Sequence, residues 1–279
     1  MPTAGTGPDP VDLWDIEVPS RPSCVPGVTM AGFDHRTAAG TVDLWPLPVP
    51  AVTLVLDAGD RSVRVDDAHG GRHRGSLAIP LTPGRIRAHG SGVRCIQVRL
   101  PPVVARSVLG VPAAALADGV VDLADLWGDG AERVEASLCA AASWEERFAL
   151  VDAELAARHQ AGPEVEPEVV HAWRAIVGAH GRLTVEALTA HTGWSRKRLW
   201  SRFRDQIGMG PKRAAMLARF DHAAHRLADG IGAAQVAAEA GYVDQSHLHR
   251  DVRTFAGATP SVVARAPWLA VDDIAWPVT

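Results

Sequence analysis

Short runs of alternating or continuous apolar residues recur over the first hundred positions, and turn-forming clusters such as Ala58-Gly59-Asp60 separate them. These runs predict strands over Val28–Phe33, Val52–Leu56, Ser62–Val65, Leu77–Leu81, Arg85–Ala88 and Val93–Leu100. Strands this short and this evenly spaced are typical of a small barrel or sandwich.

The apolar spacing becomes helical after Pro101. The new spacing predicts helices over Ala105–Leu109, Ala131–Ala142 and Ser143–Gln160. Glu146 follows Ser143 by three residues, which indicates a capping box at the start of the last of these helices. Residues 162–168 hold too few apolar side chains to pack, so they are predicted to form an interdomain linker.

The segment beyond this linker is helical throughout and repeats itself. Four residues recur 49 positions later, namely Leu199, Phe203, Gly208 and Pro211 as Leu248, Val252, Gly257 and Pro260. Ser195 likewise recurs as Asp244, and both are good helix caps. Two copies are too few for a solenoid, so the repeat predicts a duplicated supersecondary unit.

The first copy has the pattern of a helix-turn-helix. A short helix over Val185–His191 ends before Gly193, where a tight turn needs positive φ, and Ser195 caps a second helix. That second helix has one thin apolar stripe, formed by Leu199, Phe203 and Ile207. Its other faces are basic or polar, with Arg196, Lys197, Arg198, Trp200, Ser201, Arg202 and Arg204. A recognition helix needs this combination of an anchored back and a polar front.

The second copy repeats the plan with different side chains. Leu248 and Val252 face inward, and the outward set is Gln245, Ser246, His247, His249, Arg250 and Arg253. Gln and Arg can make bidentate contacts to base edges. A helix predicted over Pro211–Asp229 joins the copies and spans roughly 28 Å. This length is near the roughly 34 Å between successive major-groove openings, so one chain could read two adjacent grooves.

The charge distribution agrees with a DNA-binding module at one end of the chain. The net charge of −4 combines a balance of −6 over residues 1–162 with one of +7 over residues 170–265. Arginine alone is weak evidence, because Arg outnumbers Lys 26 to 2 along the whole chain. The three widely spaced cysteines, Cys24, Cys95 and Cys139, suit a reducing cytoplasm. Neither a secretory signal nor a membrane span is predicted.

Residues 170–265 resemble the DNA-binding domain of the AraC/XylS family of bacterial transcription regulators. The first unit carries the resemblance through Leu188, Gly193, Ser195, Leu199, Phe203, Gly208 and Pro211. The second carries it through Ile231, Val236-Ala237, Gly241-Tyr242, Asp244, Ser246, Leu248, Arg250, Gly257, Thr259 and Pro260. The chain departs from the family at Thr189, where Ala is usual, and at Leu248 and Val252, where Phe is usual.

The resemblance implies a two-domain α+β protein. We expect a β-rich, cupin-like barrel or sandwich followed by helices, and then an all-α domain with two helix-turn-helix units joined by a long helix. The expected divisions are a disordered N-terminus over 1–10, a sensor and dimerisation domain over 11–162, a linker over 163–168, the DNA-binding domain over 169–266 and a tail over 267–279. The tail is apolar enough to dock somewhere.

The function that follows is sequence-specific regulation of transcription by a cytoplasmic protein that is not an enzyme. The residues expected to bind DNA are Arg196, Lys197, Arg198, Trp200, Ser201, Arg204, Gln245, Ser246, His247 and Arg250. The expected partners are double-stranded promoter DNA, RNA polymerase, a small-molecule effector and a second copy of the chain. Self-association is expected through apolar stripes that the barrel leaves partly uncovered, formed by Val134, Leu138, Phe148, Val151 and Leu155.

The N-terminal domain offers weaker signals. Four histidines, His35, His69, His73 and His89, suggest a cupin metal site, but no His-x-His pair occurs, so neither a metal nor another cofactor is predicted. The aromatic residues Trp14, Phe33 and Trp45 could line a ligand pocket or belong to the core. No catalytic motif is evident. Two alternatives stay open, namely an enzyme with an accessory DNA-binding domain and an interaction module that has lost DNA binding.

Overall fold

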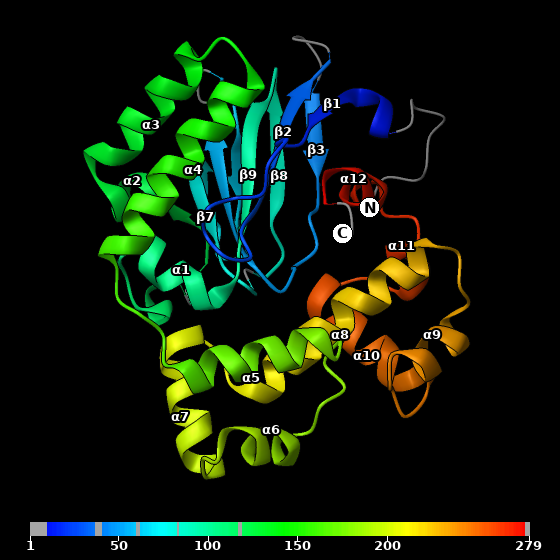
Figure 1. Cartoon of the computed structure of the whole chain (residues 1–279). Helices are drawn as coiled ribbons and strands as arrows, with labels where there is room; N and C mark the ends of the chain where they lie inside the picture. The colour runs from blue at the N-terminus through cyan, green and yellow to red at the C-terminus, as the bar shows by residue number, and fades with distance from the viewer. Residues whose placement is uncertain (1–9, 37–40, 60–61, 83, 117–118, 277–279) are drawn as a thin grey trace.

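The computed structural model describes residues 10–36, 41–59, 62–82, 84–116 and 119–276. The predicted disorder at the N-terminus therefore lies outside the described residues, except at residue 10. The β-rich first part and the all-helical second part of the prediction are both confirmed (Figure 1).

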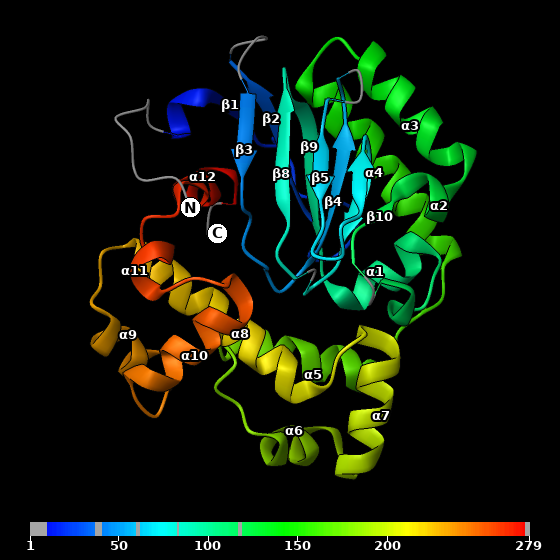
Figure 2. The same ribbon diagram turned by 180° about the vertical axis from the view of Figure 1, so that it is seen from behind.

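The N-terminal domain contains two antiparallel sheets that face each other (Figure 2). The first sheet has the strand order β1 (Trp14–Glu17), β2 (Thr29–His35), β9 (Arg94–Leu100), β4 (Val52–Asp57), β7 (Leu77–Ile79) and β10 (Val121–Asp122). The second has the order β3 (Thr41–Leu44), β8 (Arg87–Ser91), β5 (Arg64–Asp66) and β6 (Arg72–Arg74). All six predicted strands are present, although β8 lies two to three residues later than predicted.

The two faces of the first sheet contact different parts of the molecule, because side chains alternate along each strand. The inner set packs toward the second sheet and includes Ala31, Phe33, Val55 and Cys95. The outer set is covered by helices and includes Met30, Leu54, Ile96 and Val98. The strands in the middle of this sheet are therefore apolar on both faces.

The covering helices are α1 (Pro102–Leu109), α2 (Leu123–Trp127), α3 (Asp129–Ala140) and α4 (Trp144–Ala161) (Figure 1). Of two short 3-10 helices, η1 (Pro10–Leu13) precedes β1 and η2 (Ala113–Leu116) follows α1. The predicted cap of α4 is confirmed, since the Ser143 side chain accepts a hydrogen bond of 3.2 Å from the Glu146 amide. The approach of α4 to the sheet requires a glycine. A Cβ on Gly32 would lie 2.5 Å from the ring of Trp144.

The apolar stripes of α3 and α4 are not left uncovered, which corrects the reasoning behind the predicted dimer. Leu138, Phe148, Val151 and Leu155 are buried within the chain, and Val134 is partly buried against the same core. These stripes belong to the same core as the outer face of the six-stranded sheet and the neighbouring helix α1, so they do not point to a second copy.

The C-terminal part consists of α5 (Pro167–Gly178), α6 (Val185–Thr192), α7 (Arg196–Ile207), α8 (Pro211–Ala228), α9 (Ala233–Glu239), α10 (Gln245–Ala256), α11 (Pro260–Val263) and α12 (Pro267–Ala275). The linker is short, because α5 begins at Pro167. The linker residue Glu166 is also fixed. Its carboxylate accepts hydrogen bonds from Arg202 at 2.6 and 2.9 Å and from Gln206 at 3.0 Å.

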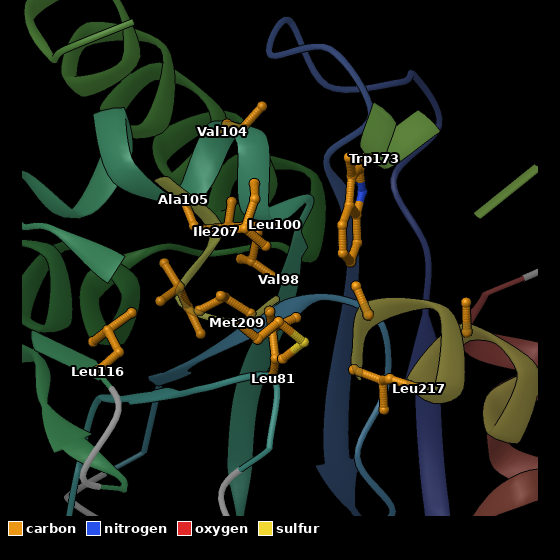
Figure 3. Packing of buried hydrophobic residues seen from close by; sticks show 14 of the residues in the cluster. Leu81, Val98, Leu100, Val104, Ala105, Leu116, Trp173, Ile207, Met209 and Leu217 are labelled. Atoms are coloured by element: carbon orange, nitrogen blue, oxygen red, sulfur yellow. The ribbon is translucent and has the colours of Figure 1, made fainter. Parts of the chain in front are cut away.

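A continuous apolar core joins the two parts of the chain. Ile207 and Met209, at the end of α7, pack toward Leu81, Ala105 and Leu116 of the N-terminal domain (Figure 3). The C-terminal helix α12 makes a second junction, because it returns to η1, β1 and β2 (Figure 1). The predicted docking of the tail is thus on the N-terminal domain.

Candidate nucleic-acid interface

The first helix-turn-helix unit consists of α6 and α7. Thr184 caps α6 by accepting a hydrogen bond from the Ala187 amide, and Ser195 caps α7 by accepting one from the Arg198 amide. Gly193 makes the turn between the helices with φ of 67°. This left-handed conformation is the one that the sequence requires at the turn.

Burial on α7 follows the predicted stripe. Leu199 and Phe203 are fully buried and Ile207 is 3% exposed, so one side of the helix is held in the core. The ring of Phe203 packs at 6.4 Å from the ring of Trp173 on α5. The anchoring fixes which side chains of α7 face outward.

All the α7 residues expected to bind DNA are exposed, namely Arg196, Lys197, Arg198, Trp200, Ser201 and Arg204. Trp200 keeps 51% of its surface exposed, so it does not belong to the core. Its ring instead packs beside Gly210, where a Cβ would lie 2.9 Å from the indole nitrogen, and under the guanidinium of Arg204 at 5.1 Å.

The second unit, α9 and α10, has the same construction. Gly241 turns the chain with φ of 76°, and Asp244 caps α10 by accepting a hydrogen bond of 2.7 Å from the His247 amide. Leu248 and Val252 are fully buried, as the repeat predicts. Phe255 adds to the anchor by stacking at 5.1 Å on Phe220 of α8.

Gln245, Ser246 and Arg250 are exposed on α10, whereas His247 is half-buried. The His247 ring meets the buried Tyr242 edge to face at 5.2 Å, which orients its imidazole. Val243, which no sequence argument singled out, is 87% exposed beside the cap of α10. An apolar side chain left in solvent at this point could contact a thymine methyl group.

Some cationic side chains of the two units form ion pairs with acidic residues, and others do not. Arg196 pairs with Glu186, and Arg202 pairs with Glu166 of the linker. The buried Asp251 pairs with Arg219 of α8 at 3.3 Å and so is not the partner of Arg250. Within the described part of the chain, no acidic side chain lies within 4 Å of the guanidinium groups of Arg204 and Arg250.

The helix between the units, α8, runs from one to the other in both views (Figures 1 and 2). Its 18 residues correspond to about 27 Å. Both units pack on it, so their separation is fixed by a rigid element.

A second candidate site lies in the N-terminal domain, where the two sheets enclose a cavity of about 160 Å³. Trp14 and Phe33 line it, as one reading of the aromatic residues predicts, whereas Trp45 instead packs against the guanidinium of Arg85 at 4.2 Å. The cavity also reaches α8 and α12.

The four N-terminal histidines do not form a metal cluster. His73 is held by Asp67 at 3.1 Å and Asp122 at 2.9 Å, and His89 lies 3.2 Å from Asp66. Among the described residues, no group of three or more His, Cys, Asp or Glu could hold a metal ion. No helix in the described ranges is long and apolar enough to cross a membrane.

Residues 188–266 match the family model of a helix-turn-helix domain. No curated protein matches the chain. Among solved structures, ToxT from Vibrio cholerae is similar at 9% identity and a TM-score of 0.47, over 91% of this chain and 100% of that one. A second ToxT structure, bound to an unsaturated fatty acid, is similar at 9% identity and the same TM-score, over 88% and 97% of the two chains.

The C-terminal domain of AraT, a response regulator from Geobacillus stearothermophilus, is similar at 20% identity and a TM-score of 0.35, over 37% of this chain and 88% of that one.

Proposed function

We propose that residues 188–266, which match the family model of a helix-turn-helix domain, form a DNA-binding domain of the AraC type, and that the chain is a sequence-specific DNA-binding regulator of transcription. One observation carries the proposal. The chain holds two helices, α7 and α10, that are each capped, anchored by a buried stripe and left polar on the outward side. This is the arrangement by which a recognition helix enters the major groove.

The two recognition helices are proposed to act differently. The outward face of α7 is mostly cationic, which suits contacts to phosphates, and phosphate contacts supply affinity that does not depend on sequence. The outward face of α10 offers Gln245, Ser246, His247 and Arg250, which can read base edges. Arg204 and Arg250 test this division best, because neither is engaged by an acidic neighbour in the described residues.

Arg250→Ala is expected to cost about 1–3 kcal/mol on the cognate site and to relax the preference at one base position. Arg204→Ala is expected to weaken binding to cognate and random DNA alike, and to reduce the slope of log affinity against log salt by about one charge. The measurement is a titration of each variant on cognate and scrambled DNA over a salt series. Arg174→Ala, on the exposed side of α5, is the control.

Equal losses on both DNAs for Arg250→Ala would remove Arg250 from the base-reading set. Unchanged binding by both variants would overturn the assignment of the recognition helices. Absence of any salt-dependent binding to DNA would favour the interaction-module alternative, and turnover of a substrate by the N-terminal domain would favour the enzyme alternative.

The N-terminal domain is proposed to sense a small-molecule effector. The support is the cavity between its sheets, whose lining is mainly apolar and which extends to α8 of the DNA-binding domain. A ligand there could bias the position of the helix that spaces the recognition helices. As a regulator, the protein is proposed to work in the cytoplasm with RNA polymerase. Self-association stays a prediction, tested by sedimentation with and without DNA.

A further inference from the structure

The cavity of the N-terminal domain has one cationic end. Along β9 the alternate residues Cys95, Gln97 and Arg99 line it. Arg99 is the single Arg or Lys in the described lining. The remainder of the wall that the sheets provide is largely apolar, as in the case of Phe33.

The two facing sheets of the N-terminal domain are called the barrel below. Among the described residues, the guanidinium of Arg99 is engaged by α12 and not by this barrel. Its Nη2 donates to both carboxylate oxygens of Asp272, at 2.7 and 2.8 Å. The ring of Trp276, just after α12, lies over it at 4.3 Å. Leu269 and Ala275, two apolar residues of α12, are also buried. A segment outside the helix-turn-helix match, which ends at residue 266, therefore closes the cavity.

Two titratable side chains of α8, His225 and Asp221, lie near the Asp272 carboxylate. His225 Nε2 lies 3.7 Å from Asp272 Oδ2, and Asp221 lines the cavity beside it. Hydrogen bonding to Asp272 raises the pKa of His225 to about 9, and burial raises the pKa of Asp221. Burial opposes the ionisation of Asp272, but His225 and Arg99 outweigh it and hold the pKa of this carboxyl below its ordinary value.

Without Asp272, Arg99 and His225 would lose the carboxylate that both of them contact, and the one other acidic residue in the described lining would be Asp221 of α8, whose pKa burial raises. An unpaired charge at such a place is costly, so the site needs an anion. The size of the cavity limits the ligand that could supply one. An apolar cavity of about 150 Å³ holds a benzene ring, so a ligand of roughly that size fits.

We propose that α12 is a built-in competitor for the ligand of this cavity. Asp272 occupies the place of the anionic group of a small apolar acid, and such an acid releases α12 when it pairs with Arg99. The proposal rests on the proposed function, because it names the effector class and the regulation of the sensor cavity. Release of α12 would also free α8, since Asp272 bridges Arg99 of the barrel and His225 of α8.

The first test uses the full chain and no ligand. Asp272→Asn removes the charge and keeps the shape, and Asp273→Asn is the matched control, because Asp273 is exposed on the same helix. Hydrogen exchange over residues 267–276 is expected to be at least about tenfold faster in Asp272→Asn than in the wild type or the control. Unchanged exchange over residues 94–100 shows that the barrel stays folded. Equal exchange of the two variants over 267–276 overturns the proposal.

The second test uses cyclohexanecarboxylate and its uncharged amide, which have the same shape. The acid is expected to accelerate exchange over residues 267–276 in the wild type, whereas the amide is not. The acid is also expected to bind Asp272→Asn at least about tenfold more tightly than the wild type in calorimetry, because the internal competitor is gone. Arg99→Met should abolish the preference for the acid.

Equal binding of acid and amide by Asp272→Asn, or no binding of the acid at millimolar concentration, overturns the anionic class. The salt-dependent DNA titration of the wild type is run separately on the same preparation. A protein that binds DNA but fails these tests retains its proposed function and loses only the proposed role of α12.

Discussion

The charge on His225 should make the stability of the protein depend on pH in a calculable way. The pKa of this residue is about 9 in the folded chain and about 6.5 when unfolded. A group whose pKa is raised on folding contributes stability that is complete below the unfolded value and is lost as pH rises through the folded value. The contribution of His225 is therefore complete below pH of about 6.5 and is lost by pH of about 9 or above.

The magnitude follows from the environment of the ring. The difference between the two pKa values corresponds to about 3.4 kcal/mol. The side chain of His225 is 33% exposed, so solvent screening reduces the expected contribution to about 2 kcal/mol. The charges that face it are Asp272 from α12, Asp221 on α8 itself, and Arg99 from β9 beyond Asp272.

The assay compares the wild type with His225→Gln by denaturant unfolding at several pH values between 6 and 10. The free-energy difference between them should be largest at the acid end and smaller by about 2 kcal/mol at the alkaline end. Burial opposes the protonation of His73, but hydrogen bonds with Asp67 and Asp122 outweigh it and raise the pKa of His73; the subtraction removes this effect. Parallel curves for the wild type and His225→Gln, or a difference that grows with pH, would refute the reasoning.

Two further expectations concern the DNA-binding domain. Gly181→Ala should destabilise the protein by more than about 2 kcal/mol in denaturant unfolding, because φ is +69° and a Cβ would lie 1.9 Å from the Ala215 carbonyl oxygen. Gly193→Ala, with similar φ but open space around it, should cost only about 1 kcal/mol, and equal losses would contradict the steric argument. Residues 163–279 alone should give a helical circular dichroism spectrum and bind DNA, and an unfolded fragment would show that the domain is not independent.

The sequence predicted the DNA-binding domain in more detail than the domain that precedes it. Ser195, Gly193 and the stripe residue Phe203 determine local structure through capping, positive φ and burial, all of which follow from residue type and spacing. The N-terminal strands depend on partners far along the chain. The strand β6, Arg72–Arg74, has no apolar alternation and forms only because it pairs with β5.

The contact between Arg99 and Asp272 at the cationic end of the cavity could not be predicted from the sequence either, because it also joins distant segments. Nothing about Asp272 within its own helix indicates that it binds Arg99, because the pair forms only when the tail meets the barrel. Similarly, the linker looked too polar to pack, yet Glu166 is fixed by Arg202 of α7. Both are ion pairs between distant segments, which composition and periodicity do not reveal.

Because α12 comes late in the chain, it is synthesised well after the strands that it contacts. Asp272 and Arg99 lie 173 residues apart, and the strands of the barrel all precede α5 in the chain. Domains generally fold as units, with the N-terminal domain first as the chain emerges from the ribosome. The barrel is therefore assembled before the helix that closes it has been made. Under the competition proposed above, a small acid that binds Arg99 before α12 has been made would keep α12 from docking when translation finishes.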